Sequence, residues 1–318
     1  MKRTHKILVT GGAGFIGSHV VKALLNDGHN VCVFDNFSTG KPENLPANDS
    51  NLEVLQGDIR NWKKIHIAVQ ETDFIIHLAG VSDAVASMED PRVTFEMNTL
   101  GFTNVLDAIR QQGFAGKLIY ASDATVYGEN LENIAIKEEQ AMDKAPQTPL
   151  AETKQSIERM VDMHRRLFGL QALGLRLFNV YGEGQGKNVI SEFAKKMQAG
   201  EMITINGNGN QTRDFVYVED VVAAVKKAIK NDVTGVVNVG TGDKTSINEL
   251  AEKMATVFGV EMKAMNGSNR PGDIKNLTAN ISKMQTMLGR GKITTLKKGL
   301  ASMFNKVEKI AEPQKKAS

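Results

Sequence analysis

The chain has 318 residues, and its 39 basic and 36 acidic side chains leave a formal net charge of +3. This balance, without a long basic run, excludes the surface that nucleic acid or an anionic membrane requires, and the length suits one large α/β domain or a domain with a smaller lobe. The single cysteine, Cys32, excludes an intrachain disulfide, and neither a signal-peptide pattern nor an apolar run of about 18 residues is present, so we expect a soluble, cytoplasmic protein.

Apolar strand-like runs alternate with longer helical patterns, which is typical of a parallel sheet built from βαβ units. The patterns predict strands near 6–10, 30–35, 52–56, 73–78, 116–121 and 171–178, and helices near 15–28, 61–71, 91–112 and 150–168. Further on they predict helices near 189–199, 219–231, 247–257 and 282–288, and strands near 203–205, 215–217 and 236–239. The predicted fold is α/β: a doubly wound parallel (Rossmann) sheet in residues 1–178, an interleaved smaller mixed α/β lobe in residues 179–310, and a polar tail at 311–318.

The first strand–turn–helix unit carries a glycine-rich run, K-I-L-V-T-G-G-A-G-F-I-G, at residues 6–17. Glycines allow the tight turn and let the backbone approach a pyrophosphate, and the helix N-terminus offers N–H groups and the positive end of its dipole. The second strand delivers Asp35 eighteen residues after Gly17, where an acid binds both ribose hydroxyls of NAD and repels the extra phosphate of NADP. The unit therefore predicts an NAD site.

Residues at the ends of the third and fourth strands are also expected at the cofactor. Asp58 could hold an adenine edge or cap the next helix. The run His77-Leu78-Ala79-Gly80 could pass beneath the adenosine and nicotinamide, with His77 itself packed in its strand. Cys32, inside the apolar second strand, is expected to be a small buried hydrophobe. No cluster has the spacing of metal ligands, so no metal site is expected.

Five later motifs, together with the glycine-rich run, allow a comparison with known protein families. They are Y-A-S-D-A-T-V-Y-G (120–128), T-P-L-A-E-T-K (148–154), L-R-L-F-N-V-Y-G-E-G (175–184), N-G-N-G-N-Q-T-R-D-F-V-Y-V-E-D-V (206–221) and N-R-P-G-D-I (269–274). With the glycine run they resemble, from about residue 6 to 300, the extended short-chain dehydrogenase/reductase family, in particular its NAD-dependent nucleotide-sugar epimerases and dehydratases of the UDP-glucose 4-epimerase type. The resemblance implies transient oxidation of the sugar at C4, with a UDP-sugar the expected partner.

The resemblance also implies site residues, carried over position by position. The NAD site would be lined by Gly11, Gly14, Phe15, Ile16, Gly17, Asp35, Asn36, Asp58, Ile59, Leu78, Ala79, Gly80, Asn98 and Lys154. The nucleotide-diphosphate sugar would meet Asn179, Asn188, Val189, Arg213, Arg270 and Asp273. Two arginines suit a diphosphate, which favours charge-assisted and often bidentate hydrogen bonds.

The catalytic motif departs from the family pattern, in which a tyrosine four residues before the lysine acts with a serine or threonine of the fifth strand. Lys154 is in place, but Leu150 and Asp123 occupy the other two positions. Leucine cannot carry a proton. Three interpretations follow. The chain is a catalytically silent binder, natural or deliberately mutated, or Asp123 acts as the base while Thr125 hydrogen-bonds a sugar hydroxyl. In the third, the motif alignment is displaced by a few residues and one of the four tyrosines is the base.

Two other classes of function stay open. A nucleotide-sugar dehydratase or 4-keto reductase uses the same scaffold, but Ala124 and Thr125 occupy the places where a dehydratase carries an acid/base pair. A binding or regulatory subunit is the second class. The helical patterns at 91–112 and 150–168 carry apolar residues beyond one narrow stripe, and the resemblance implies a homodimer through these helices.

Overall fold

The computed structural model describes residues 3–140, 145–186, 188–268, 272 and 274–311. Its main sheet has seven parallel strands in the order β11-β6-β5-β4-β1-β2-β3. The strands are β1 (Lys6–Thr10), β2 (Asn30–Asp35), β3 (Leu52–Gln56), β4 (Phe74–His77), β5 (Lys117–Asp123), β6 (Gln171–Leu177) and β11 (Gly235–Val239). The order reverses between β1 and β4, and ligands of such sheets bind at the carboxyl ends of strands beside this switch.

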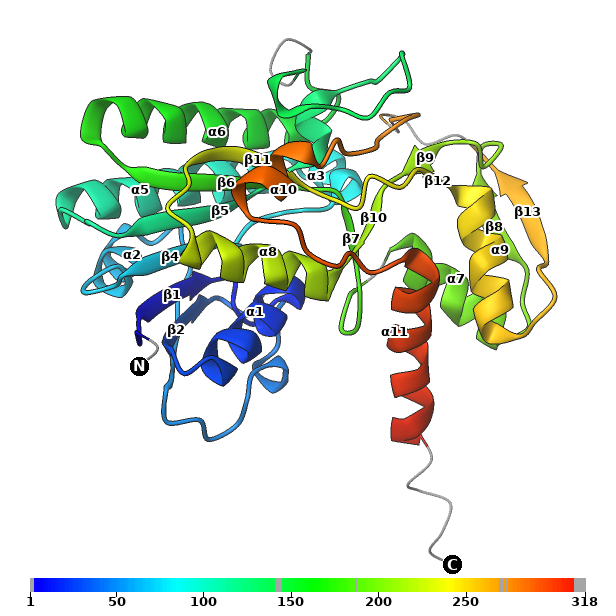
Figure 1. The fold of residues 1–318 in the computed structure, drawn as a ribbon, viewed down its shortest axis with the longest axis horizontal. Helices are drawn as coiled ribbons and strands as arrows, with labels where there is room; N and C mark the ends of the chain where they lie inside the picture. Colours follow the sequence, from blue (N-terminus) through cyan, green and yellow to red (C-terminus); the bar gives the residue numbers. More distant parts are fainter. Residues whose placement is uncertain (1–2, 141–144, 187, 269–271, 273, 312–318) are drawn as a thin grey trace, which may run out of the picture.

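Helices cover both faces of the sheet (Figure 1). One face carries α1 (Phe15–Asn26), α8 (Val218–Lys230) and α10 (Ser282–Met287), and the other carries α2 (Trp62–Ala68), α5 (Gly101–Gln111) and α6 (Pro149–Phe168). Apolar residues of these helices pack on the strands in two separate core clusters, one on each face of the sheet. Because α8 and β11 come after β7 to β10 in sequence, the chain returns from its second lobe to complete the first sheet.

The second lobe has its own core, built by α7 (Val189–Gln198), α9 (Ile247–Phe258) and α11 (Leu296–Ala311). Its strands form three short pairs: β7 (Asn179–Tyr181) with β10 (Phe215–Tyr217), β9 (Thr212–Arg213) with β12 (Thr245–Ser246), and β8 (Ile203–Asn206) with β13 (Ala264–Gly267). A short helix, α3 (Ala84–Glu89), follows β4. Single 3₁₀ turns occur at Pro42–Asn44, Ala124–Tyr127 and Glu138–Gln140.

The doubly wound α/β prediction is confirmed, and the segment predicted as a helix near 91–112 is helical over residues 91–111, although it is not a regular α-helix throughout. The segment consists of α4 (Pro91–Phe95), a π-helical turn at Glu96–Leu100 and α5. The π turn contains Asn98, whose buried side chain bonds across to Val81 and Thr153. The hydrophobic periodicity of a sequence does not reveal one extra residue in a helical turn, so the π turn could not be predicted. Turns of this kind are frequent at functional sites.

Two further findings concern the composition-based expectations. Cys32 is 4% exposed, and burial raises the pKa of its thiol to about 12, so it is a packed side chain as predicted. Among the described residues, no helix combines the length and the apolar character that crossing a bilayer needs.

Candidate functional site

The glycine turn between β1 and α1 forms an open cradle. A Cβ on Gly17 would lie 2.1 Å from the carbonyl oxygen of Gly11, and one on Gly11 would lie 2.7 Å from the Ala79 nitrogen at the end of β4. Gly14 begins the helix, and no side chain caps α1 there. Helix starts leave their first N–H groups without intrahelical partners. The chain thus presents backbone donors where the sequence predicts Phe15 and Ile16 at a pyrophosphate, which fits NAD.

Asp35 lies directly beside this turn. One carboxylate oxygen accepts the N–H of Ala13 at 2.9 Å and the other accepts the N–H of Phe37 at 2.8 Å, and the residue is 7% exposed. A carboxylate offers about four lone-pair sites, so both oxygens keep capacity for ribose hydroxyls. The arrangement holds a negative charge at the end of β2, as the sequence predicts for an acid that selects NAD.

We expect Asp35→Asn to weaken NAD binding about tenfold and to reduce the preference for NAD over NADP. The amide keeps an acceptor for one of the two N–H groups but loses the charge, and charge-assisted hydrogen bonds are roughly twice as strong as neutral ones. Fluorescence titration with both cofactors measures this. Asp49→Asn, at a half-buried acid of the same lobe, serves as the control, and an unchanged NAD/NADP ratio in Asp35→Asn would contradict the assignment.

Asp58, which the sequence left between two roles, does not cap the next helix. Asn61 is the N-cap of α2, and its side chain accepts the N–H of Lys64. Asp58 instead pairs with Arg60 at 2.8 Å and accepts from the Asn36 amide at 3.0 Å. The Arg60 guanidinium holds the pKa of the Asp58 carboxyl well below its usual range. Ile59, the next residue, is buried.

The end of β4 is fixed by Asn98. Its side-chain oxygen accepts the Val81 N–H at 2.8 Å, and its nitrogen donates to the Val81 carbonyl and to the Thr153 hydroxyl of α6. A Cβ on Gly80 would lie 2.6 Å from the same oxygen. Asn98 therefore ties the Leu78–Gly80 segment to α6. His77 is packed as predicted: it is 3% exposed, bonds to Thr10, and burial lowers its pKa to about 3.

Three residues that the sequence analysis predicts to be catalytic, Asp123, Thr125 and Lys154, lie together at the end of β5. Lys154 is 8% exposed, and its ammonium donates to the Ala121 carbonyl at 2.9 Å. Asp123 accepts the Thr125 N–H at 2.8 Å. Burial raises the pKa of Asp123, against the opposing effects of the Thr125 hydrogen bonds and of Lys154. Burial likewise lowers the pKa of Lys154, so the site holds a carboxyl and an amine that are each less readily charged than in water.

Leu150 lies in the first turn of α6 and is 1% exposed. All four tyrosines are described, and none replaces it. The Tyr127 hydroxyl donates to Asn238 and accepts from Arg176, Tyr181 bonds to Leu296 and packs on Tyr217 in the second lobe, and Tyr120 lines a cavity beneath α6. These contacts give no support to the interpretation that a displaced alignment hides the catalytic tyrosine.

The substrate positions that the structure describes lie at the start of the second lobe. Asn179 begins β7, Asn188 caps α7 ahead of Val189, and Arg213 lies in β9. Asn188 accepts the Ser191 N–H through its oxygen, while its buried amide nitrogen has no partner among the described residues. An unpaired buried donor at this position fits a polar ligand. Arg270 and Asp273 lie outside the described residues.

Sequence reasoning missed a buried polar network behind these positions. Arg176 of β6 forms a two-point pair with Glu158 of α6, and each residue is 4% exposed. The same guanidinium donates to the Tyr127 hydroxyl at 2.9 Å and to the Glu138 carbonyl at 2.7 Å, and Ser122 donates to Glu158. The network locks β5, β6 and α6 behind Asp123. The one signal of this network in the sequence was Arg176, a charged residue inside an apolar strand. A buried charge needs a partner.

His19 links the glycine-turn helix to the second lobe. One ring nitrogen lies 3.0 Å from a carboxylate oxygen of Glu219 in α8, and the other lies 2.9 Å from the Glu183 carbonyl, just before the predicted substrate segment. Both partners are acceptors, so the two bonds form together when the ring carries both protons. The hydrogen bond that His19 donates to Glu219 raises the pKa of His19, against burial and the charge of Lys22.

We expect this link to make stability depend on pH. Since the folded-state pKa lies above 6.5, the stabilisation is fully present below pH 6.5 and is lost as the pH rises through the folded-state pKa. The loss should be at most about 1 kcal/mol, the net contribution of one hydrogen bond. Urea unfolding between pH 6 and pH 9 measures it. A His19→Gln variant should lack this slope, and a wild-type slope of the opposite sign would refute the link.

Three comparisons with known proteins bear on the site. A family model described as the NAD dependent epimerase/dehydratase family matches residues 7–240. A putative UDP-glucose 4-epimerase of Methanocaldococcus jannaschii is 35% identical over 94% of this chain and 97% of its own, and UDP-glucuronic acid decarboxylase 1 of Xenopus tropicalis is 32% identical over 98% and 74%. The crystal structure of a Thermotoga maritima UDP-glucose 4-epimerase with UDP-glucose has a TM-score of 0.90 at 32% identity, covering 96% of this chain and 100% of that one.

Proposed function

The chain belongs to the NAD-dependent epimerase/dehydratase family, and from this premise we propose that it binds a UDP-sugar and epimerises it at C4, with Asp123 in place of the missing tyrosine as the acid/base group. The observation that carries the proposal is the geometry at the end of β5. A half-buried carboxyl with a raised pKa lies beside Lys154 and next to the buried hydroxyl oxygen of Thr125.

The proposed chemistry divides the work among these side chains. NAD, when bound, supplies the hydride acceptor that oxidation of a sugar alcohol requires. Asp123 takes the proton of the C4 hydroxyl at the carboxylate oxygen that the Thr125 N–H does not occupy, and returns it after the sugar has turned over. Burial makes Asp123 a stronger base than an exposed carboxylate, while Lys154 partly offsets this. The Thr125 hydroxyl orients the sugar. The reaction has no net redox change, so the cofactor stays bound.

Proton NMR of the protein with NAD and UDP-galactose, UDP-N-acetylglucosamine or UDP-glucuronate tests the proposal. We expect a slow appearance of the C4 epimer, reduced at least 10²-fold in Asp123→Asn, since a positioned general base contributes 10²–10⁴-fold. The amide retains an acceptor for the Thr125 N–H. Glu152→Gln, on α6 two residues from Lys154, should keep the wild-type rate. A decarboxylated or dehydrated sugar in the same spectra would contradict epimerisation.

A second candidate is a silent protein that binds NAD and a nucleotide sugar without turnover. Leu150 favours it, because a buried leucine fills the catalytic position and no tyrosine substitutes for it. The same spectra separate the two: bound sugar with no product at all supports the silent binder. Binding itself should survive in either case, since the cradle and the unpaired Asn188 donor lie apart from Leu150.

We also propose that the chain is a cytoplasmic homodimer through α5, α6 and the preceding π turn. Leu100 is 50% exposed, Leu167 is 66% exposed and Phe168 is 55% exposed on these elements. Native mass spectrometry should give twice 34.7 kDa, and Leu100→Glu/Leu167→Glu should give the monomer mass. Ile67→Glu, at an exposed apolar residue of α2, should leave the dimer intact. A wild-type monomer would rule the interface out.

A further inference from the structure

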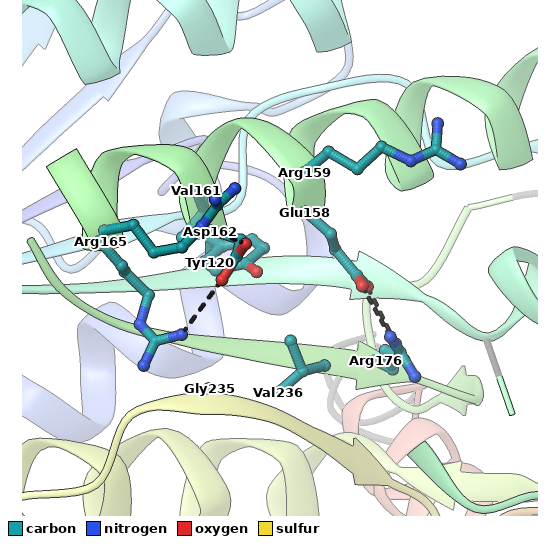
Figure 2. Close-up of a pocket in the computed structure, with 10 residues that line it drawn as sticks. Tyr120, Glu158, Arg159, Val161, Asp162, Arg165, Arg176, Gly235 and Val236 are labelled. Carbon is teal, nitrogen blue, oxygen red and sulfur yellow. Dashed lines mark hydrogen bonds and ion pairs between the residues drawn. The ribbon is translucent and has the colours of Figure 1, made fainter. Parts of the chain in front are cut away.

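A cavity of about 480 Å³ lies beneath the C-terminal half of α6, between that helix and the strands β5, β6 and β11 (Figure 2). Its volume is in the range of small-molecule sites. It is separate from the glycine cradle, because none of its lining residues belongs to the turn, to Asp35 or to the Asp123 group. Figure 2 shows the side chains of α6 projecting along one wall, with β11 forming the opposite one.

The charge of the lining is positive and only partly neutralised. Four arginines and two acids line the cavity, which leaves two positive charges. Arg176 is fully occupied by Glu158. Asp162 serves two arginines at once: Arg166 donates to it at 3.0 Å, and Arg165 lies 3.6 Å from its other oxygen. This single carboxylate therefore leaves one positive charge of that group without a counter-charge.

Arg159 supplies the second positive charge. Its guanidinium donates to the neutral side chain of Gln155 at 3.1 Å, and no acid pairs with it among the described residues. Arg165 also donates to the neutral Thr234 hydroxyl at 3.2 Å. Both arginines line the cavity, Arg165 half-buried and Arg159 exposed, and the two side chains project from different ends of the helix segment (Figure 2). Guanidinium forks match the oxygens of a phosphate or carboxylate.

Tyr120 adds an independent observation. Its side chain is 1% exposed, lines the cavity, and its hydroxyl has no hydrogen bond with any residue that the structure describes. The ring lies across Gly174 of β6, where a Cβ would be 2.6 Å from the hydroxyl oxygen, so the glycine makes room for it. Burial raises the pKa of Tyr120 well above its ordinary value, so the hydroxyl is a donor at every physiological pH.

We propose that this cavity is a second ligand site, which takes a small organic phosphate monoester, with the phosphate on Arg159 and Arg165 and the Tyr120 hydroxyl as an additional donor. A phosphate monoester carries a charge of about −1.5 to −2 at neutral pH, which matches the two uncompensated positive charges. The volume exceeds what a bare phosphate fills, and Val161 and Val236 offer apolar surface to the organic part. Nucleoside and sugar phosphates share this chemistry.

Calorimetric titration of the NAD-saturated protein tests the site. The probes are phenyl phosphate, glycerol 3-phosphate and inorganic phosphate, the first two standing for aromatic and polar organic parts. We expect one molecule of an ester to bind per chain. Arg159→Gln/Arg165→Gln should weaken this binding at least tenfold, and Tyr120→Phe about fivefold. NAD affinity, measured on the same samples, should not change, which shows that each variant is folded. Arg92→Gln, at an exposed arginine of α4, is the matched control.

Each outcome of the titration either supports or overturns the proposed ligand site. Tighter binding of phenyl phosphate than of glycerol 3-phosphate would identify an aromatic ligand, and the reverse a sugar-like one; both support the site. Inorganic phosphate binding as tightly as both esters would overturn the organic ligand. Absence of saturable binding, or binding that the double variant and Tyr120→Phe leave unchanged, would overturn the site itself.

Discussion

The Leu150→Tyr/Asp123→Ser variant should epimerise a UDP-sugar 10²–10⁴-fold faster than Leu150→Phe/Asp123→Ser, which has no general base. Lys154 is already in place, and its charge would favour the phenolate of a tyrosine one helical turn away, as it acts on the pKa of Asp123. The expected gain is the range that a positioned general base supplies. Rates of C4-epimer formation by proton NMR, at saturating NAD, measure it.

The matched control for this gain is Leu150→Phe/Asp123→Ser, which adds the ring without the hydroxyl. It should stay at or below the natural rate, because Phe cannot carry a proton. Equal rates in the Tyr and Phe variants would show that ring volume, not proton transfer, limits the reaction. A natural chain as fast as the Tyr variant would show that Asp123 already suffices.

Arg176→Met should lower the free energy of unfolding by about 3–5 kcal/mol, the cost of removing one partner from a buried ion pair. The substitution leaves Glu158 as an uncompensated buried charge and takes a donor away from the Tyr127 hydroxyl and the Glu138 carbonyl. Urea unfolding followed by circular dichroism measures the difference. The effect is large because the pair lies between β6 and α6 with almost no access to water.

The double variant Arg176→Met/Glu158→Leu separates two contributions to the lost free energy of unfolding, the uncompensated charge of Glu158 and the change in side-chain packing. It should recover part of the lost stability, since replacing both members of a buried pair by apolar groups is often close to neutral. Arg166→Met, whose guanidinium is 71% exposed and pairs with Asp162 on the surface, should change the free energy of unfolding by less than about 1 kcal/mol. A loss as large as that of Arg176→Met would contradict this account.

The sequence was sufficient for elements whose patterns are local. The glycine turn, Asp35 at the end of β2 and the strand alternation follow from residue types and spacing. The π turn at 96–100 was not predictable, because one inserted helical residue shifts no apolar position far enough to be noticed. The short pairs such as β9 with β12 involve two residues each, too few for any periodicity.

The site residues likewise divide into those that the sequence could identify and those that only the fold shows. Lys154 and Leu150 were identified by their place in a motif, but the partner of Arg176 could not be, since Glu158 lies on another element and only the fold brings them together. The role of Asn98 was likewise hidden: its three hydrogen bonds join β4 to α6 across more than fifty residues of chain. The cavity beneath α6 depends on a glycine in β6 that no motif marks.

The place of β11 at the end of the main sheet affects how the chain is made. Residues 235–239 pair with β6, yet the whole second-lobe segment from β7 to α8 is synthesised between them. During translation, β6 therefore emerges as an exposed edge strand and stays so until residue 239 leaves the ribosome, some seconds later at ordinary elongation rates. An unpaired edge is a template for aggregation. The nascent protein thus depends on its late segments to close a sheet that its first half has already built.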